Sequence, residues 1–277
     1  MKRFSLNIKG ELLSLDNPLV MGILNVTTDS FYDGGKYLDE KNILQQVEKM
    51  LNDGATIIDV GAQSTRPNAT LLSQEIELQK VLPIVKLICK EFPTAIISID
   101  TFYSEVAAQC VLEGVAIIND ISAGNIDANM FETVGKLKVP YILMHSRGTP
   151  QTMQNLTEYD NVVTDVYKYF TEKIALLKQF GVLDIIVDLG FGFAKTTENN
   201  FELLKCQSVF RGLGHPILTG ISRKGMVYKT LDTTPENALN GTSVLNTIAL
   251  QNGANILRVH DVKEAVEVIK LVSLCFL

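Results

Sequence analysis

Eight short apolar runs recur along the chain, and each ends in a polar residue that is followed by Gly, Ser or Thr and then by a helical pattern. An aliphatic run without alternation is typical of a parallel strand that is covered on both faces. From Asn25 to Arg258 the runs recur about every 33 residues, and a βα unit takes about 30 or more. The predicted strands are Leu19 to Asn25, Thr56 to Asp59, Ala95 to Asp100, Ala116 to Asn119, Pro140 to His145, Ile185 to Asp188, Pro216 to Gly220 and Asn255 to Arg258.

Eight βα units in 277 residues predict a (β/α)8 TIM barrel, whose active site lies at the carboxyl ends of its strands. A doubly wound open sheet is the alternative, because strand runs alone do not prove closure. Residues 3 to 15 alternate around Lys9-Gly10-Glu11 and predict a short β-hairpin that plugs the amino end of the barrel. No Pro/Ser-rich linker or charge block divides residues 1–277, so we expect one domain.

Stripes of apolar residues at helical spacing predict the helices between the strands. The first two are expected near Glu40 to Asp53 and Ser73 to Phe92. The fifth carries a stripe from Val163 to Leu177 and the eighth a stripe from Val262 to Val272. Such stripes favour packing against the strands over a cofactor site.

The net charge of −6 and a pI near 5.2 exclude the basic stripe of a nucleic-acid-binding protein, so we expect a small-molecule partner. We also expect no membrane segment, because no run reaches roughly 18 uncharged apolar residues. The amino end lacks the apolar run of a signal peptide. The cysteines show no CxxC spacing and lie in apolar helical settings, which predicts buried thiols in a reducing, cytoplasmic compartment. They stand at Cys89, Cys110, Cys206 and Cys275.

Acidic and basic side chains gather where the predicted strands end. Asp59, Asp100 and Asp188 close three strands, although Asp59 could equally be a cap that stabilises the fold. Four arginines also follow strands, and their planar guanidinium groups suit phosphates and carboxylates, which points to an anionic substrate. These arginines are Arg66, Arg147, Arg223 and Arg258.

Other candidate chemistry is weaker. His145 and His260 end strands, but no HxH or HExxH spacing supports zinc. No Gly-x-Ser-x-Gly elbow is present, and no strand-end Cys lies beside a His, so a covalent Ser or Cys nucleophile is not favoured. Lys224 could form a Schiff base, or it could bind an anion or a carbonyl oxygen.

These strand-end segments together resemble the dihydropteroate synthases of folate biosynthesis, a family of pterin-binding enzymes. The resemblance spans nearly the whole chain in the family's order. The matching segments are Met21 to Gly35, Gly54 to Pro67, Ser98 to Thr101, Ile118 to Ile121, Leu143 to His145, Asp188 to Lys195, Gly220 to Lys224 and Leu257 to Val262.

The resemblance implies condensation of (7,8-dihydropterin-6-yl)methyl diphosphate with 4-aminobenzoate, with magnesium on the diphosphate held by Asn25. It assigns the pterin to Asp188, Asn119 and Lys224, and it makes Asp100, Lys224 and Arg258 the catalytic residues. The diphosphate would meet Thr65, Arg66, Arg258 and His260, and the benzoate would meet Phe31, Pro67, Phe193 and Ser222. Gly220 and Val259 complete the implied substrate-binding residues. It also implies that the loops at Thr27 to Tyr37 and Gln63 to Asn68 fold over the site.

The sequence departs from the family pattern at four positions that flank the ligand residues. They are Thr28 for Pro, Ala62 for Gly, Asn68 for Gly and Leu189 for Pro. These departures bear on loop rigidity and on the affinity for 4-aminobenzoate or for sulfonamides, for which the family is a target. The alternatives are a pterin-binding methyltransferase and a catalytically silent pterin-binding subunit. The family likeness also implies a homodimer through the last helices.

Overall fold

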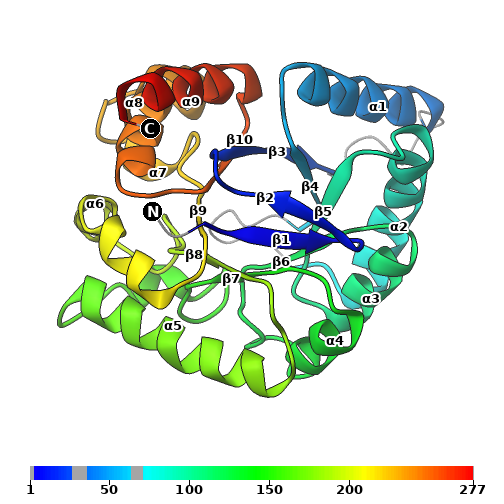
Figure 1. Ribbon diagram of the computed structural model, residues 1–277, viewed down its shortest axis with the longest axis horizontal. Coiled ribbons are helices and arrows are strands. Elements are labelled where there is room, and N and C mark those ends of the chain that lie inside the picture. Colours follow the sequence, from blue (N-terminus) through cyan, green and yellow to red (C-terminus); the bar gives the residue numbers. More distant parts are fainter. Residues whose placement is uncertain (1–2, 27–35, 64–70, 277) are drawn as a thin grey trace.

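The chain forms a closed barrel of eight parallel strands (Figure 1). The structure, a computed structural model, describes residues 3–26, 36–63 and 71–276. Around the barrel the strands follow the order β10-β3-β4-β5-β6-β7-β8-β9. The strands are β3 (Leu19–Asn25), β4 (Ile57–Gly61), β5 (Ile96–Asp100), β6 (Ile117–Asp120), β7 (Tyr141–Met144), β8 (Ile185–Asp188), β9 (Ile217–Thr219) and β10 (Ile256–Val259).

Helices form an outer ring around the strands (Figure 1). They are α1 (Lys36–Asn52), α2 (Gln74–Glu91), α3 (Ser104–Leu112), α4 (Met130–Leu137), α5 (Val162–Gln179), α6 (Thr197–Lys205), α7 (Gly225–Tyr228), α8 (Leu239–Gln251) and α9 (Val262–Phe276). Within the described residues, the 3-10 turns η2 (Met153–Asn155), η3 (Gln207–Leu213) and η4 (Pro235–Asn237) lie in the connections. None of the helices in the described ranges is long and apolar enough to span a bilayer.

The barrel closes because β10 pairs in parallel with both β3 and β9. This pairing rules out the open doubly wound sheet that was the alternative from the sequence. The strands are almost wholly buried. Buried apolar side chains of the strands pack against those of the surrounding helices and form one core. Continuous aliphatic runs suit this position, since both faces of each strand are covered.

Local capping explains where the helices begin. The side chain of Ser73 accepts a hydrogen bond from the backbone N–H of Ile76. As a result, α2 begins one residue after the predicted start. Asn161 caps α5 in the same way by accepting from Thr164 N at 2.9 Å. Such caps satisfy N–H groups that the first turn of a helix leaves unpaired.

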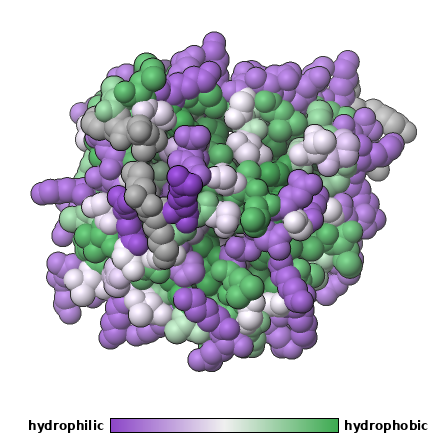
Figure 2. Space-filling view, viewed as in Figure 1, coloured by the Kyte–Doolittle hydropathy of each residue, from purple (hydrophilic) through white to green (hydrophobic). Residues whose placement is uncertain are grey.

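The predicted amino-terminal hairpin consists of β1 (Ser5–Ile8) and β2 (Glu11–Ser14). It crosses the amino end of the barrel (Figure 1), and its buried Leu6 and Ile8 join an apolar cluster with the inward-facing side chains of the strands. The plug predicted from the sequence is therefore confirmed. Figure 2, seen from the same side, shows hydrophilic residues around the rim of this face and hydrophobic residues nearer its centre.

The cysteine prediction holds only in part. Cys110 is buried, and burial raises the pKa of its thiol to about 12. Cys89 and Cys206 are half-buried. Cys275, near the end of α9, is exposed, contrary to expectation. The sequence near Cys275 is apolar nearly all round, so the pattern does not show which side of the helix packs against the barrel.

Candidate active site

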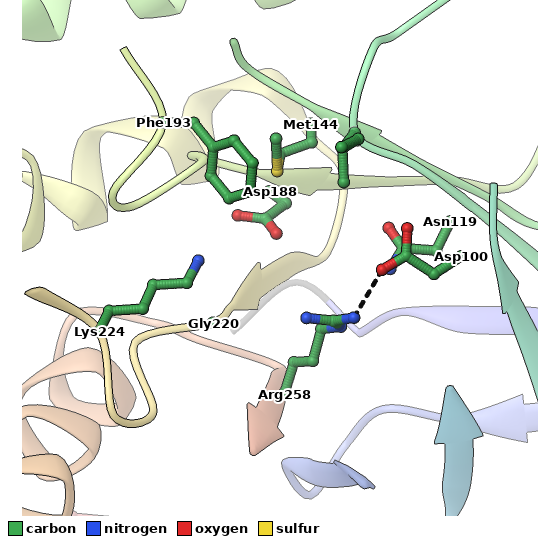
Figure 3. A pocket seen from close by; sticks show the side chains of 9 residues that line it. Asp100, Asn119, Met144, Asp188, Phe193, Gly220, Lys224 and Arg258 are labelled. Carbon is green, nitrogen blue, oxygen red and sulfur yellow. Dashed lines mark hydrogen bonds and ion pairs between the residues drawn. The ribbon is translucent and has the colours of Figure 1, made fainter. Parts of the chain in front are cut away.

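The carboxyl ends of strands β5 to β10 and the loops that follow them line one cavity (Figure 3). Strand pairing places Gly61, Asp100 and Asn119 side by side at this end, and it sets Met144 beside Asp188. Parallel strands with aligned ends therefore gather side chains that are far apart in the sequence. The lining residues are Asp100, Asn119, Ile121, Met144, Asp188, Phe193, Gly220, Lys224 and Arg258.

Arg258 at the end of β10 makes two ion pairs across the barrel. Its Nε donates to Asp59 Oδ2 at 2.6 Å, and its Nη2 donates to Asp100 Oδ2 at 2.7 Å. Burial acts against the charge of the guanidinium, but Asp59 and Asp100 outweigh burial and raise the pKa of Arg258 above its ordinary value. The guanidinium is thus held as a cation at the wall of the cavity.

Asp59 is fully buried and joins two cavity residues from behind. Its Oδ2 accepts from Asn119 Nδ2 at 2.9 Å as well as from Arg258. Its Oδ1 has no hydrogen-bond partner within the described ranges. Asp59 therefore fixes the directions in which Asn119 and Arg258 point. From the sequence, Asp59 is a strand-end acid with an equally plausible capping role, and the family resemblance assigns it no ligand.

Asp100 is a carboxyl group with an altered acidity. Desolvation by burial raises its pKa to about 7, and the neighbouring Asp59 charge adds to the rise, while Arg258 opposes it. Since burial dominates, the group changes its charge near neutral pH. Strongly shifted groups in a cavity are candidates for catalysis.

Asp188 and Lys224 occupy another part of the cavity, away from Asp100 in Figure 3. The backbone N–H of Gly190 donates to Asp188 Oδ1 at 2.8 Å, and burial raises the pKa of Asp188 while Lys224 opposes the rise. Lys224 Nζ donates to the carbonyl oxygen of Phe191 at 2.7 Å, and lies 4.9 Å from the centroid of the Phe193 ring. The cavity thus offers an acceptor and a donor beside an aromatic face.

Burial lowers the pKa of Lys224 to about 8, although the Asp188 charge opposes that change. The amine is held by a carbonyl oxygen and faces an aromatic ring, which suits a hydrogen-bond donor to a ligand. Of the two roles left open by the sequence, this contact favours binding over formation of a Schiff base.

Ser222 and His260 lie together beside this cavity. Ser222 Oγ is 3.1 Å from His260 Nδ1 and accepts from His260 N at 3.2 Å. Desolvation and the Arg258 charge lower the pKa of His260 to about 4. His260 is consequently neutral at pH 7, so it offers an anion a hydrogen bond and not a positive charge.

Seven predicted site residues line the cavity, and the other predicted residues within the described ranges do not. Asn25 is exposed at the carboxyl end of β3. Val259 is buried in the core, so its side chain is not open to a ligand. Four predicted residues lie outside the described residues, as do Thr28 and Asn68. These four are Phe31, Thr65, Arg66 and Pro67.

The sequence did not identify two apolar residues of the cavity lining, or one buried pair of polar side chains, as parts of the site. Ile121 and Met144 line the cavity, and both stand in segments that matched the family pattern. His145, which follows Met144 in the chain, and Lys195 touch each other, with 2.9 Å between Nδ1 and Nζ. In the part of the chain that the structure describes, no three His, Cys, Asp or Glu side chains form a group that could hold a metal ion.

Known proteins resemble this chain in both sequence and structure. A family model described as pterin-binding enzyme matches residues 21–260. The dihydropteroate synthase of Escherichia coli K12 is 42% identical over 267 residues, which cover 96% of this chain and 94% of the relative.

Solved structures give the same result. A Xanthomonas albilineans dihydropteroate synthase with 4-aminobenzoic acid has a TM-score of 0.91 and 34% identity, covering 99% of this chain and 98% of that one. A structure of the Xanthomonas albilineans enzyme in complex with 7,8-dihydropteroate has a TM-score of 0.87 and 32% identity, and covers 98% of each chain. Family model, relatives and structures agree over nearly the full length, and the chain belongs to the pterin-binding enzymes and, within them, to the dihydropteroate synthases.

Proposed function

We propose that this protein condenses (7,8-dihydropterin-6-yl)methyl diphosphate with 4-aminobenzoate to give 7,8-dihydropteroate and diphosphate. The observation that carries the proposal is one cavity with Asp188, Asn119, Lys224 and Arg258, in a chain so close to known dihydropteroate synthases. The amine nitrogen forms a bond to the pterin methyl carbon. The bond from that carbon to the diphosphate oxygen breaks, its electron pair leaves with diphosphate, and the amine loses a proton.

The buried polar groups of the cavity fit the edge of a pterin ring. The amino-pyrimidinone edge presents parallel N–H donors, and an ionised Asp188 accepts both. Asn119 and Lys224 serve the remaining ring heteroatoms. Asn119 is oriented for this task by Asp59, and Lys224 by the carbonyl oxygen of Phe191. We assign Gly220 to the same wall, since an added Cβ there would lie 3.8 Å from Lys224 Nζ.

Asp100 and Arg258 are proposed to act on the reacting carbon and its leaving group. Departure of diphosphate leaves positive charge on the pterin methyl group, and an ionised Asp100 stabilises it. Arg258 binds the departing diphosphate, together with Thr65, Arg66, His260 and the backbone at Val259. Phe31, Pro67, Phe193 and Ser222 are assigned to 4-aminobenzoate. For Phe193 the support is its place in the cavity wall.

Magnesium is proposed to accompany the diphosphate. The donor set fits this ion, because the amide oxygen of Asn25 is a hard ligand, exposed at the carboxyl end of β3. Mg²⁺ usually keeps several waters and takes one or two protein oxygens beside those of a phosphate, so it needs no cluster of acidic side chains. When bound, it would neutralise charge on the leaving group.

We further propose that the protein is one domain that works in the cytoplasm as a homodimer through α8 and α9. The exposed side chains of Val244, Leu271 and Leu274 on these helices support a dimer surface. Sedimentation of the wild type and of Leu271→Glu/Leu274→Glu tests it. A wild-type monomer at micromolar concentration would contradict the dimer.

The test of the proposed activity is formation of 7,8-dihydropteroate, detected by mass spectrometry, together with release of diphosphate that depends on 4-aminobenzoate. Both products are expected in equal amounts. A folded protein that binds a pterin but yields neither product would favour a silent pterin-binding subunit. Binding of a methylated pterin without diphosphate chemistry would favour a methyltransferase.

A further inference from the structure

A buried lysine, Lys195, contacts the loop that carries the cavity residue Phe193 but does not itself line the cavity. Lys195 is only 5% exposed. Its Nζ is 2.9 Å from the carbonyl oxygen of Gly190, 2.9 Å from that of Phe193 and 2.9 Å from His145 Nδ1. The carbonyl oxygen of His145 lies slightly farther away, at 3.4 Å. An ammonium group has three N–H donors, and these acceptors use all three.

The backbone that Lys195 holds is tightly wound. Residues 189–195, here called the β8 loop, include positive φ angles of 67° at Gly190, 83° at Gly192 and 48° at Ala194. Ala194 has a Cβ, so its left-handed conformation is strained. A Cβ added at Gly190 would lie 1.9 Å from the carbonyl oxygen of His145, so the loop runs directly against the end of β7. Lys195 donates hydrogen bonds to the carbonyl oxygens of both Gly190 and His145, the two residues of this contact.

The β8 loop in turn places three groups of the cavity. Gly190 N donates to Asp188 Oδ1 at 2.8 Å, and the carbonyl oxygen of Phe191 accepts from Lys224 Nζ at 2.7 Å. The ring of Phe193 forms part of the cavity wall. Asp188, Lys224 and Phe193 therefore all depend on the backbone path between Gly190 and Phe193, whose two ends Lys195 joins.

We propose that Lys195, with His145 as its partner, is a positioning residue for the reaction, which holds the β8 loop so that Asp188, Lys224 and Phe193 meet the pterin. The proposal rests on the proposed function, because it assumes that these three groups bind that substrate. Burial lowers the pKa of Lys195 well below its ordinary value, and the Asp188 charge opposes this. Burying the amine costs desolvation free energy, and three hydrogen-bond acceptors and a nearby carboxylate offset this cost.

Lys195→Met keeps most of the length of the side chain and removes its donors, and it is the first test. A matched control is Lys173→Met, which removes another lysine that donates to a backbone carbonyl, that of Ala123 at 2.9 Å, and that lies outside the cavity lining. The dissociation constant for 6-hydroxymethyl-7,8-dihydropterin is measured by calorimetry on the folded fraction, and the melting temperature is recorded for each variant.

We expect Lys195→Met to raise the dissociation constant for the pterin about tenfold or more, and Lys173→Met to leave it within about twofold, whatever either does to melting. A lower melting temperature with wild-type pterin affinity in Lys195→Met would overturn the proposal. If Lys195→Met does not fold, Lys195→Arg takes its place, because it keeps the charge but moves the donor atoms. A folded Lys195→Arg protein with unchanged pterin affinity would equally overturn it.

Chemical rescue adds a readout that general loss of stability would not move. In Lys195→Ala, propylammonium supplies the missing ammonium group, and we expect it to recover part of the pterin affinity, whereas tetramethylammonium, which has no N–H donor, does not. Equal effects of both ions would count against the proposal. Wild-type protein assayed in parallel separates the two ideas: if it forms no 7,8-dihydropteroate the proposed function fails, and if it does, the variants test Lys195 alone.

Discussion

Arg258 and Asp59 stand 199 positions apart in the sequence, yet Arg258 Nε donates to Asp59 Oδ2 at 2.6 Å. The contact joins β10 to β4 on either side of β3, inside the closed barrel. Because the same Asp59 oxygen also accepts from Asn119, one carboxylate orients a proposed diphosphate-binding group and a proposed pterin-binding group.

Removal of the Arg258 charge is expected to destabilise the fold. Arg258→Ala leaves the buried Asp59 and Asp100 without their cation, and breaking a buried pair costs about 3–5 kcal/mol. The free energy of unfolding, measured with urea, should fall by that amount. Arg147→Ala is the control, because its pairing with Asp165 is half-exposed and such pairs contribute about 1 kcal/mol or less. Similar losses for both variants would refute this account of Arg258.

Asp188→Asn should weaken pterin binding. The amide places a donor where the ring edge needs an acceptor, and buried polar groups left unpaired cost about 1–3 kcal/mol, or roughly ten- to hundredfold in affinity. Calorimetry with a pterin lacking phosphate measures this loss. Asp184→Asn, one residue before the start of β8, changes the same charge at the amino end of that strand and should bind the pterin normally. Unchanged affinity in Asp188→Asn would remove Asp188 from the pterin site.

The pH dependence of the reaction should reflect Asp100. Since burial raises the pKa of Asp100 to about 7, the group is mostly neutral below that pH and mostly ionised above it. If the ionised form stabilises the pterin cation, kcat/KM rises as the pH passes through about 7. The charge of Asp59 contributes to the raised pKa, so Asp59→Asn should move the ascending limb to lower pH. A limb at the same pH in both proteins would assign it to another group.

Asn25→Ala should raise the magnesium concentration needed for half-maximal activity, because it removes the proposed protein ligand of the ion. Calorimetric titration of diphosphate, with and without magnesium, provides a second measurement. Magnesium should strengthen diphosphate binding to the wild type more than to Asn25→Ala. An identical magnesium effect in both proteins would exclude Asn25 as a ligand.

The barrel was predictable from the sequence because every strand is buried on both faces and must therefore be continuously apolar. The observed strands agree with the predicted ones within about two residues at each end, as for Ile57–Gly61 against Thr56 to Asp59. The cavity residues followed from the same pattern, since parallel strands bring their carboxyl ends to one place. Asp100, Asp188 and Arg258 were found in this way, whereas the family resemblance assigned Asn119, Phe193 and Gly220 to the site.

Contacts between side chains could not be predicted from the pattern. The double role of Asp59 depends on which oxygen faces Asn119 and Arg258, and the place of Lys195 depends on a loop with three left-handed residues. The neutral state of His260 arises from burial and from a charge that the fold brings near. The roles of Phe31, Thr65, Arg66 and Pro67 stay predictions.

The hairpin at the amino end limits the route by which small molecules can reach the cavity. Leu6, Ile8 and Leu15 seal that end with packed apolar side chains, so ligands reach the cavity from the carboxyl end. Both substrates and both products then share one entrance. The barrel is therefore closed at its amino end, and any exchange of ligands at Asp188 takes place through the carboxyl end.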